Sequence, residues 1–139
     1  MTKIIEHLEE ATIRFAGDSG DGMQLVGSQF SETSGFAGNE VNTFPDYPSE
    51  IRAPEGTLYG VSAFQIHFGT QHIHTSGDHI DVLVAMNASS LKVNMANLKP
   101  GGIIIANIEG FDERNLTLAK YAVNPLTDGS LAKYDVHAI

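Results

Sequence analysis

A glycine-rich turn between a strand-like and a helix-like segment is the feature that most constrains the fold. Residues 11–16, Ala-Thr-Ile-Arg-Phe-Ala, combine β-branched and aromatic side chains in the alternating pattern of a strand. The turn at residues 17–22, Gly-Asp-Ser-Gly-Asp-Gly, follows directly, and apolar residues then recur at helical spacing from Met23 to Phe30. Strand, glycine turn and helix in this order indicate the beginning of a βαβ unit.

Further strands alternate with helices along the rest of the chain. The patterns predict strands at 58–68, 80–86, 103–108 and 132–139, and helices at 89–98 and 115–122. We expect an ordered loop at 42–54, because its three prolines exclude a helix or a central strand. The chain is therefore predicted to form a three-layer α/β domain of the Rossmann-like type, with a mostly parallel or mixed sheet and helices on both faces.

Composition excludes several classes of function. The chain has 139 residues and no cysteine, so it offers no disulfide, thiolate zinc site, cysteine nucleophile or iron–sulfur ligand. Its 17 acidic and 8 basic residues give a formal net charge of −9, which opposes binding to nucleic acid. No signal peptide and no apolar run of about 20 residues is evident in the sequence. We therefore expect a cytoplasmic protein that binds neither nucleic acid nor membranes.

Three loops each follow a predicted strand of this sheet. They lie at residues 17–22, 87–90 and 108–112, and Ser89 or Ser90 is available to cap the helix that begins after the second loop. In parallel sheets the ligand binds outside the carboxyl ends of the strands. These loops are therefore the expected location of any ligand site.

The glycine turn permits two readings. Its pattern, Gly17-x-x-Gly20-x-Gly22, allows backbone N–H groups at a helix start to cradle a phosphate, although it matches neither the dinucleotide fingerprint nor a P-loop. The alternative is a tight turn without ligand, in which Asp21 caps the helix and Gln24 completes a capping box. The residues alone leave both readings open.

The proline-rich segment carries a candidate anion ligand. Arg52, on a rigid loop near aromatic residues, can bind a carboxylate or phosphate through two N–H groups. The alternative is a structural ion pair with Glu50 or Asp46.

A histidine-rich stretch is the only other concentration of reactive side chains. It contains His67, His72, His74 and His79. A metal site there is disfavoured, since no second ligand pair or nearby carboxylate cluster supports it. No nucleophile elbow of the Gly-x-Ser-x-Gly type is present, which excludes a serine hydrolase of that class. We therefore assign no metal ligand. We also name no catalytic residue in this chain.

Several motifs together resemble one known family. They are Ile13-Arg-Phe-Ala-Gly-Asp-Ser-Gly-Asp-Gly-Met-Gln24, Thr43-Phe-Pro-Asp-Tyr-Pro-Ser-Glu-Ile-Arg-Ala-Pro54, Asp81-Val-Leu-Val-Ala-Met-Asn87 and Lys99-Pro-Gly-Gly102. The sequence resembles the gamma domain of 2-oxoacid:ferredoxin oxidoreductases, most closely the 2-oxoglutarate type in which it begins a fused gamma–alpha subunit. The resemblance implies a leader at 1–12 and a gamma-type domain at 13–139 that is C-terminally incomplete.

The resemblance also implies a reaction, namely oxidative decarboxylation of a 2-oxoacid with coenzyme A to acyl-CoA, CO₂ and reduced ferredoxin. In that family thiamine diphosphate, magnesium and iron–sulfur clusters belong to partner domains or subunits, and ferredoxin is reached through the complex. This chain would be an inactive component by itself. It would supply part of the coenzyme A site and a packing surface for the alpha and beta portions.

Carried over residue by residue, the resemblance implies a set of cofactor-binding positions. They are Gly17, Ser19, Gly20, Asp21, Gly22, Met23, Glu50 and Arg52. Ser19 stands where relatives carry a glycine and Asp21 where they carry a glutamine. An alternative function keeps the same complex but makes the chain a structural interaction module without a ligand site.

Overall fold

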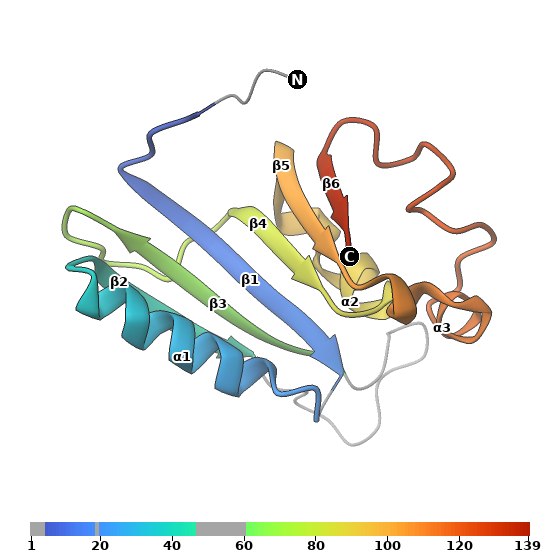
Figure 1. The fold of residues 1–139 in the computed structure, drawn as a ribbon, viewed down its shortest axis with the longest axis horizontal. Helices are drawn as coiled ribbons and strands as arrows, with labels where there is room; N and C mark the ends of the chain where they lie inside the picture. Colours follow the sequence, from blue (N-terminus) through green and yellow to red (C-terminus); the bar gives the residue numbers. More distant parts are fainter. Residues whose placement is uncertain (1–4, 19, 47–60) are drawn as a thin grey trace.

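The domain is built on a single six-stranded mixed sheet (Figure 1). The computed structural model describes residues 5–18, 20–46 and 61–139. The strand order is β2-β3-β1-β4-β5-β6, and among these strands β3 alone runs in the direction opposite to the other five. The strands are β1 (Glu10–Asp18), β2 (Glu40–Asp46), β3 (Val61–Gly69), β4 (Ile80–Ala85), β5 (Leu98–Ala106) and β6 (Asp135–Ala138).

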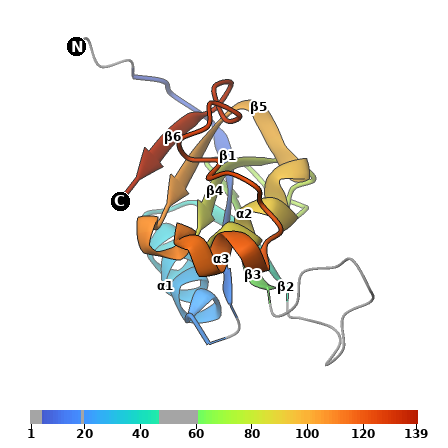
Figure 2. The same ribbon diagram turned by 90° about the vertical axis from the view of Figure 1, so that its right-hand side faces the viewer.

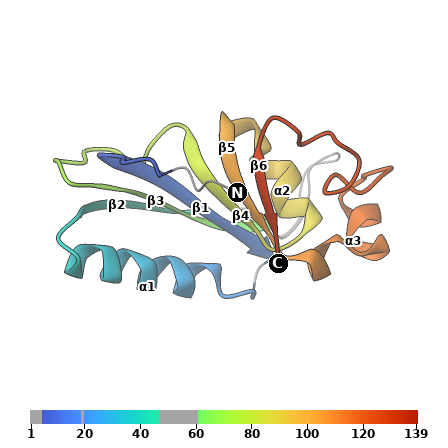
Figure 3. The same cartoon turned by 45° about the horizontal axis from the view of Figure 1, so that its top comes forward.

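Helices cover both faces of the sheet, as Figures 2 and 3 show from two sides. Helix α1 (Met23–Phe36) lies over β1, β2 and β3 on one face. Helix α2 (Ala88–Asn94) covers the other face and contacts α3 (Glu113–Leu118). Two short 3₁₀ turns, η1 (Met95–Asn97) and η2 (Ile108–Phe111), join these elements to β5 and α3. The predicted three-layer α/β architecture is thus confirmed.

Strand β1 lies in the middle of the sheet and sorts its side chains between the two layers. It pairs with β3 on one side and with β4 on the other. Phe15 packs on the α1 side, where the Phe30 ring lies 5.7 Å from it between the centroids. Arg14 is buried on the opposite side, where it bonds to Asn94 of α2. This alternation of period two is what the sequence predicted for residues 11–16.

The hydrophobic core lies mainly between the sheet and α2. Leu83 of β4, Ile104 of β5 and Leu91 of α2 are each 0% exposed. Close packing on the other face depends on Gly27 of α1, because a Cβ atom there would overlap the ring of Phe64 on β3. A small residue in mid-helix is therefore required for α1 to approach the sheet.

Two sequence predictions for the strands are wrong in part. Residues 40–46 form strand β2 rather than the loop expected from 42 onward. Pro45 is tolerated because β2 is the outermost described strand, where a missing N–H costs no central ladder bond. Strand β5 begins at Leu98, five residues before the predicted start. It contains Gly101, whose φ is 76°, where the register of β5 against β4 shifts. The rest of the proline-rich segment, 47–60, lies outside the described residues.

The helix after β4 also differs from its prediction in detail. Its N-cap is Asn87, not Ser89 or Ser90, and Ser90 instead completes a capping box with Asn87. The α-helix ends at Asn94 and gives way to a 3₁₀ turn. Within the described part of the chain, no helix has the length and apolar character needed to cross a membrane.

Candidate functional site

The glycine turn after β1 is closed by one of its own carboxylates. The Asp21 Oδ2 atom accepts a hydrogen bond of 2.8 Å from the backbone N–H of Asp18. The Asp21 N–H in turn donates to the Asp18 carbonyl at 3.0 Å. Gly17 makes room for this arrangement, since a Cβ atom there would lie 2.8 Å from Asp21 Oδ2. The turn therefore holds a negative charge of its own close to the backbone donors.

The capping box predicted at the start of α1 is wrong. The N-cap of α1 is Gly22, with φ 80°, and no side chain caps the helix. Asp21 is turned back toward β1, so it cannot reach the first N–H groups of the helix. Gln24 reaches the sheet instead, where its Nε2 atom donates to the Ala63 carbonyl at 2.9 Å and to Ser62 Oγ at 3.2 Å. The first turn of α1 thus keeps N–H donors without a side-chain partner at the N-cap.

Asn87 joins the glycine turn to the loop after β4. Its Nδ2 atom donates to Asp18 Oδ1 at 2.8 Å, while its Oδ1 atom accepts the Ser90 N–H, also at 2.8 Å. Asn87 is only 5% exposed, and its bond to Ser90 is buried, whereas its bond to exposed Asp18 is partly buried. One side chain therefore fixes the end of β1 relative to the start of α2.

The loop after β5 packs against the loop after β4. The Asn107 N–H donates to the Ala85 carbonyl at 3.1 Å, and Asn107 Nδ2 donates to the Met86 carbonyl at 3.3 Å. Gly110 packs so closely on Met86 and Asn87 that any Cβ atom would overlap their backbone. The three loops that follow β1, β4 and β5 therefore meet at one end of the sheet.

The described residues at this end of the sheet offer groups that can bind an anion. Backbone N–H groups at the start of α1 favour an anion, because a helix N-terminus carries partial positive charge and the first turn contains no acidic residue. The carboxylates of Asp18 and Asp21 oppose an anion that lies deep in the turn. The arrangement fits a ligand that contacts the rim of the turn.

The predicted site residues fall into two groups. The structure brings together five of them at the glycine turn, namely Gly17, Gly20, Asp21, Gly22 and Met23. Ser19, Glu50 and Arg52 lie outside the described residues.

A buried arginine on β1 forms a second polar cluster that the sequence analysis did not single out. Arg14 donates from Nε to Asn94 Oδ1 at 2.5 Å, from NH1 to Gln65 Oε1 at 3.2 Å, and from NH2 to Asp46 Oδ2 at 2.5 Å. Arg14, Asp46 and Gln65 line a pocket of about 290 Å³ together with Gly77. The signal was present, because alternation places Arg14 between Thr12 and Ala16 on an inward face.

The histidine-rich stretch forms no metal centre among the residues that the structure describes, where no group of three potential ligands occurs. The His67 Nδ1 atom lies 2.7 Å from the Thr75 carbonyl. The rings of His72 and His74 stack with centroids 6.2 Å apart.

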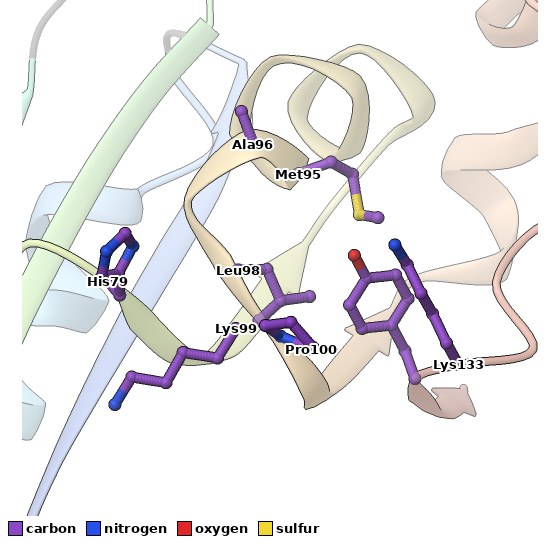
Figure 4. A pocket seen from close by; sticks show the side chains of 8 residues that line it. His79, Met95, Ala96, Leu98, Lys99, Pro100 and Lys133 are labelled. Carbon is purple, nitrogen blue, oxygen red and sulfur yellow. The ribbon is translucent and has the colours of Figure 1, made fainter.

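A separate pocket of about 520 Å³ lies at the opposite end of the strands from the glycine turn (Figure 4). His79 precedes β4, Leu98 and Lys99 begin β5, and Lys133 precedes β6. Figure 4 shows His79 and Lys133 on different sides of Leu98. The pocket contains none of the predicted site residues and lies at the amino ends of the parallel strands, away from the glycine turn.

Comparisons with known proteins agree with this architecture. The chain is 52% identical over 134 residues to the 2-oxoglutarate oxidoreductase subunit KorA of Mycobacterium tuberculosis, covering 96% of this chain and 20% of that protein. The chain thus spans about a fifth of the length of this curated relative.

Solved structures share the fold. A 2-oxoglutarate:ferredoxin oxidoreductase from Magnetococcus marinus, with 2-oxoglutarate, coenzyme A and succinyl-CoA bound, superposes with a TM-score of 0.66 and 23% identity over 95% of this chain and 20% of that chain. The gamma subunit of a keto/oxoacid ferredoxin oxidoreductase from Geobacter sulfurreducens gives a TM-score of 0.61 and 19% identity, over 93% of this chain and 59% of that one.

The family model for pyruvate ferredoxin/flavodoxin oxidoreductase matches residues 12–139, which include every strand-end loop described above. The resemblance read from the sequence motifs is therefore confirmed, and the chain belongs to the pyruvate ferredoxin/flavodoxin oxidoreductase family.

Proposed function

We propose that this chain is the gamma-type domain of a 2-oxoglutarate:ferredoxin oxidoreductase and contributes to coenzyme A binding and to assembly of the complex. The identity of 52% to a 2-oxoglutarate oxidoreductase subunit supports the substrate class. The observation that carries the binding role is the glycine turn held against α2 by the bond between Asp18 and Asn87. That bond fixes a rim of backbone donors at the edge where α/β sheets bind ligands.

The domain boundaries are part of the proposal. The expected leader at 1–12 overlaps the first strand, because β1 begins at Glu10. The leader would therefore end before Glu10, and the gamma-type domain, expected at 13–139, would begin with β1 and continue into a longer polypeptide. The length of the relatives supports this, since the chain spans 20% of KorA and 59% of the Geobacter gamma subunit. The complex would be cytoplasmic and would pass electrons to ferredoxin.

The chemistry would be divided between this chain and its partners. Thiamine diphosphate, magnesium and iron–sulfur clusters would be held by the alpha and beta portions and would supply decarboxylation and electron transfer. The sequence contains no cysteine, so this chain offers no thiolate ligand for an iron–sulfur cluster. The role of this chain would be to bind and orient the thiol co-substrate.

The proposed contacts with coenzyme A lie on two segments. The N–H groups of Ser19, Gly20, Gly22 and Met23 would face its phosphates from the rim of the turn, with Gly17 and Asp21 setting the shape of that turn. Arg52 would pair with a phosphate, and Glu50 would orient Arg52.

A second function is favoured by one observation. Asp21 already accepts the Asp18 N–H inside the turn, so this backbone donor is satisfied without a ligand. This supports a structural module that only docks against the alpha and beta portions.

Titration of the assembled oxidoreductase with coenzyme A, dephospho-CoA and ADP by calorimetry separates the two functions. In the first, the Arg52→Ala enzyme assembles normally and binds coenzyme A at least tenfold more weakly, because a charge-assisted hydrogen bond is lost. Unchanged affinity in an assembled Arg52→Ala enzyme would reject the assignment of Arg52. Arg114→Ala, on the exposed helix α3, is the matched control for removal of an arginine.

A further inference from the structure

The two faces of strands β4 and β5 differ sharply in burial. On the side of α2, Leu83, Ala85, Ile104 and Ala106 are all 0% exposed. The alternate residues on the other side form what we call the open face, namely Val82, Val84, Ile103 and Ile105. Ile103 is 36% exposed and the other three are partly exposed. Figure 1 shows this side, where α1 covers the left part of the sheet and no described helix lies across β4 and β5.

Parallel strands of this kind are normally covered on both faces. Strands β1, β4, β5 and β6 run parallel, and all four residues of the open face are aliphatic. An apolar strip in the centre of a parallel sheet is therefore a surface that needs a partner.

The strip has the width of one helix. Neighbouring strands lie about 4.8 Å apart, so β4 and β5 together offer about 10 Å, which is the diameter of a helix with its side chains. Helix α1 packs mainly on β1, β2 and β3, and β4 is the next strand beyond β1. On β6 the strip ends at exposed Asp135 and His137, which pair at 3.1 Å.

We infer that the open face binds an amphipathic helix from the part of the same polypeptide that lies outside these 139 residues. The inference rests on the proposed function, in which the chain is one domain of a longer protein. Chains of the relatives are long enough to supply such a helix, since this chain spans 59% of the Geobacter gamma subunit and 67% of the Thermotoga maritima pyruvate oxidoreductase subunit PORC.

A second copy of the chain is a poorer occupant. A stable interface buries about 800 Å² on each partner. The open face consists of four side chains, and the most exposed of them, Ile103, is 36% exposed. Their exposed area is much smaller than such an interface requires. A helix connected through the chain needs less contact area, because linkage removes most of the entropy cost of association.

The test is photo-crosslinking in the full polypeptide within the assembled oxidoreductase. Ile103→p-benzoylphenylalanine is compared with the same replacement at Val123, which is 62% exposed and lies outside the open face. We expect position 103 to crosslink to a segment of the same polypeptide outside residues 1–139, with apolar residues three and four apart. A crosslink to a second copy or to another subunit, or no crosslink, overturns the inference.

Thermal melting of the same protein gives a second readout. Ile103→Lys is expected to lower the Tm by about 4 °C through burial of a charge under the helix, and Val123→Lys to leave it unchanged. Equal Tm values for the two variants would overturn the inference. Neither measurement depends on coenzyme A, so loss of cofactor binding in the titration would reject the proposed function and leave the docking surface to be judged by the crosslink.

Discussion

The amide of Asn87 and the carboxylate of Asp18 lie 2.8 Å apart and connect the loops that follow β1 and β4. Asn87 also caps α2, so its two functions can be separated by mutation. Asn87→Asp keeps the cap oxygen but places a second carboxylate against Asp18. We predict a loss of about 1 to 2 kcal/mol in the free energy of unfolding at neutral pH.

The reciprocal change provides the control for this prediction. Asp18→Asn combined with Asn87→Asp restores a donor and an acceptor across the same gap, and the double variant should recover most of the loss in urea unfolding. If the double variant is as unstable as Asn87→Asp alone, the loss does not come from the contact between positions 18 and 87.

Gly27 and Gly35 make a matched pair within α1. A Cβ atom at Gly27 would overlap the Phe64 ring, whereas one at Gly35 meets no atom within 4 Å. Gly35→Ala should therefore stabilise the domain by about 0.5 to 1 kcal/mol, through the higher helix propensity of alanine. Gly27→Ala should destabilise it by about 2 kcal/mol through overpacking. Thermal melts of both variants check the opposite signs, and a stabilised Gly27→Ala would contradict the packing described here.

Arg14 should contribute more to stability than any exposed arginine. Arg14→Met removes the donors of three hydrogen bonds and leaves polar groups of Asn94 and Gln65 without partners in a buried place. We expect a loss of about 3 kcal/mol, measured by urea unfolding with an unchanged m-value. Arg114→Met on the surface is the comparison. A difference of less than about 1 kcal/mol between the two would show that Arg14 is not a structural centre.

Asp21 should reduce the affinity of the glycine turn for phosphates. Its carboxylate accepts the Asp18 N–H and puts negative charge beside the donors of the turn. Under the proposed function, Asp21→Asn in the assembled enzyme should bind ADP and coenzyme A several-fold more tightly, as measured by calorimetry. Asp128→Asn is the control, since it removes an equal charge from a distant turn. Tighter binding in both variants would point to net charge and not to the turn.

Acid should weaken the start of α3 before other helices. Hydrogen bonds from the Asn115 backbone and side chain lower the pKa of Asp112 below its usual 3.8. A lowered pKa in the folded state means that Asp112 stabilises the fold above pH 3.8 and loses this effect as the pH falls through the lower folded value. Amide hydrogen exchange at Asn115 measured between neutral pH and pH 3 should show this loss, and Asp112→Asn should remove the pH dependence at that amide.

Local patterns predicted those parts of the fold whose structure depends on local interactions. The succession of β1, glycine turn and α1 follows from alternation and helical spacing within about twenty-five residues, and the apolar run of β4 identified a buried parallel strand. Position in the sheet was not predictable in this way. Pro45 is compatible with a strand only because β2 lies at the edge, and the edge is defined by pairing with β3, about twenty residues later.

The site shows the same division. The glycine turn was recognisable because glycine is required at particular backbone angles, as at Gly20 and Gly22 with φ of 104° and 80°. The Arg14 cluster was not recognised, because its partners lie 32, 51 and 80 residues away in the chain. An isolated Asn or Gln in a sequence does not indicate a hydrogen-bond partner. Asn94 and Gln65 become recognisable as partners of Arg14 only in the folded structure.

The position of β1 has a consequence for synthesis of the protein. The first strand to be made becomes the middle of the sheet, and its two partners, β3 and β4, end at Gly69 and Ala85. At about 5–20 residues per second, the ribosome needs roughly 3 to 10 seconds to advance from the end of β1 to the end of β3. During that interval the apolar side chains of Ile13 and Phe15 belong to a strand that has neither of its neighbours in the sheet.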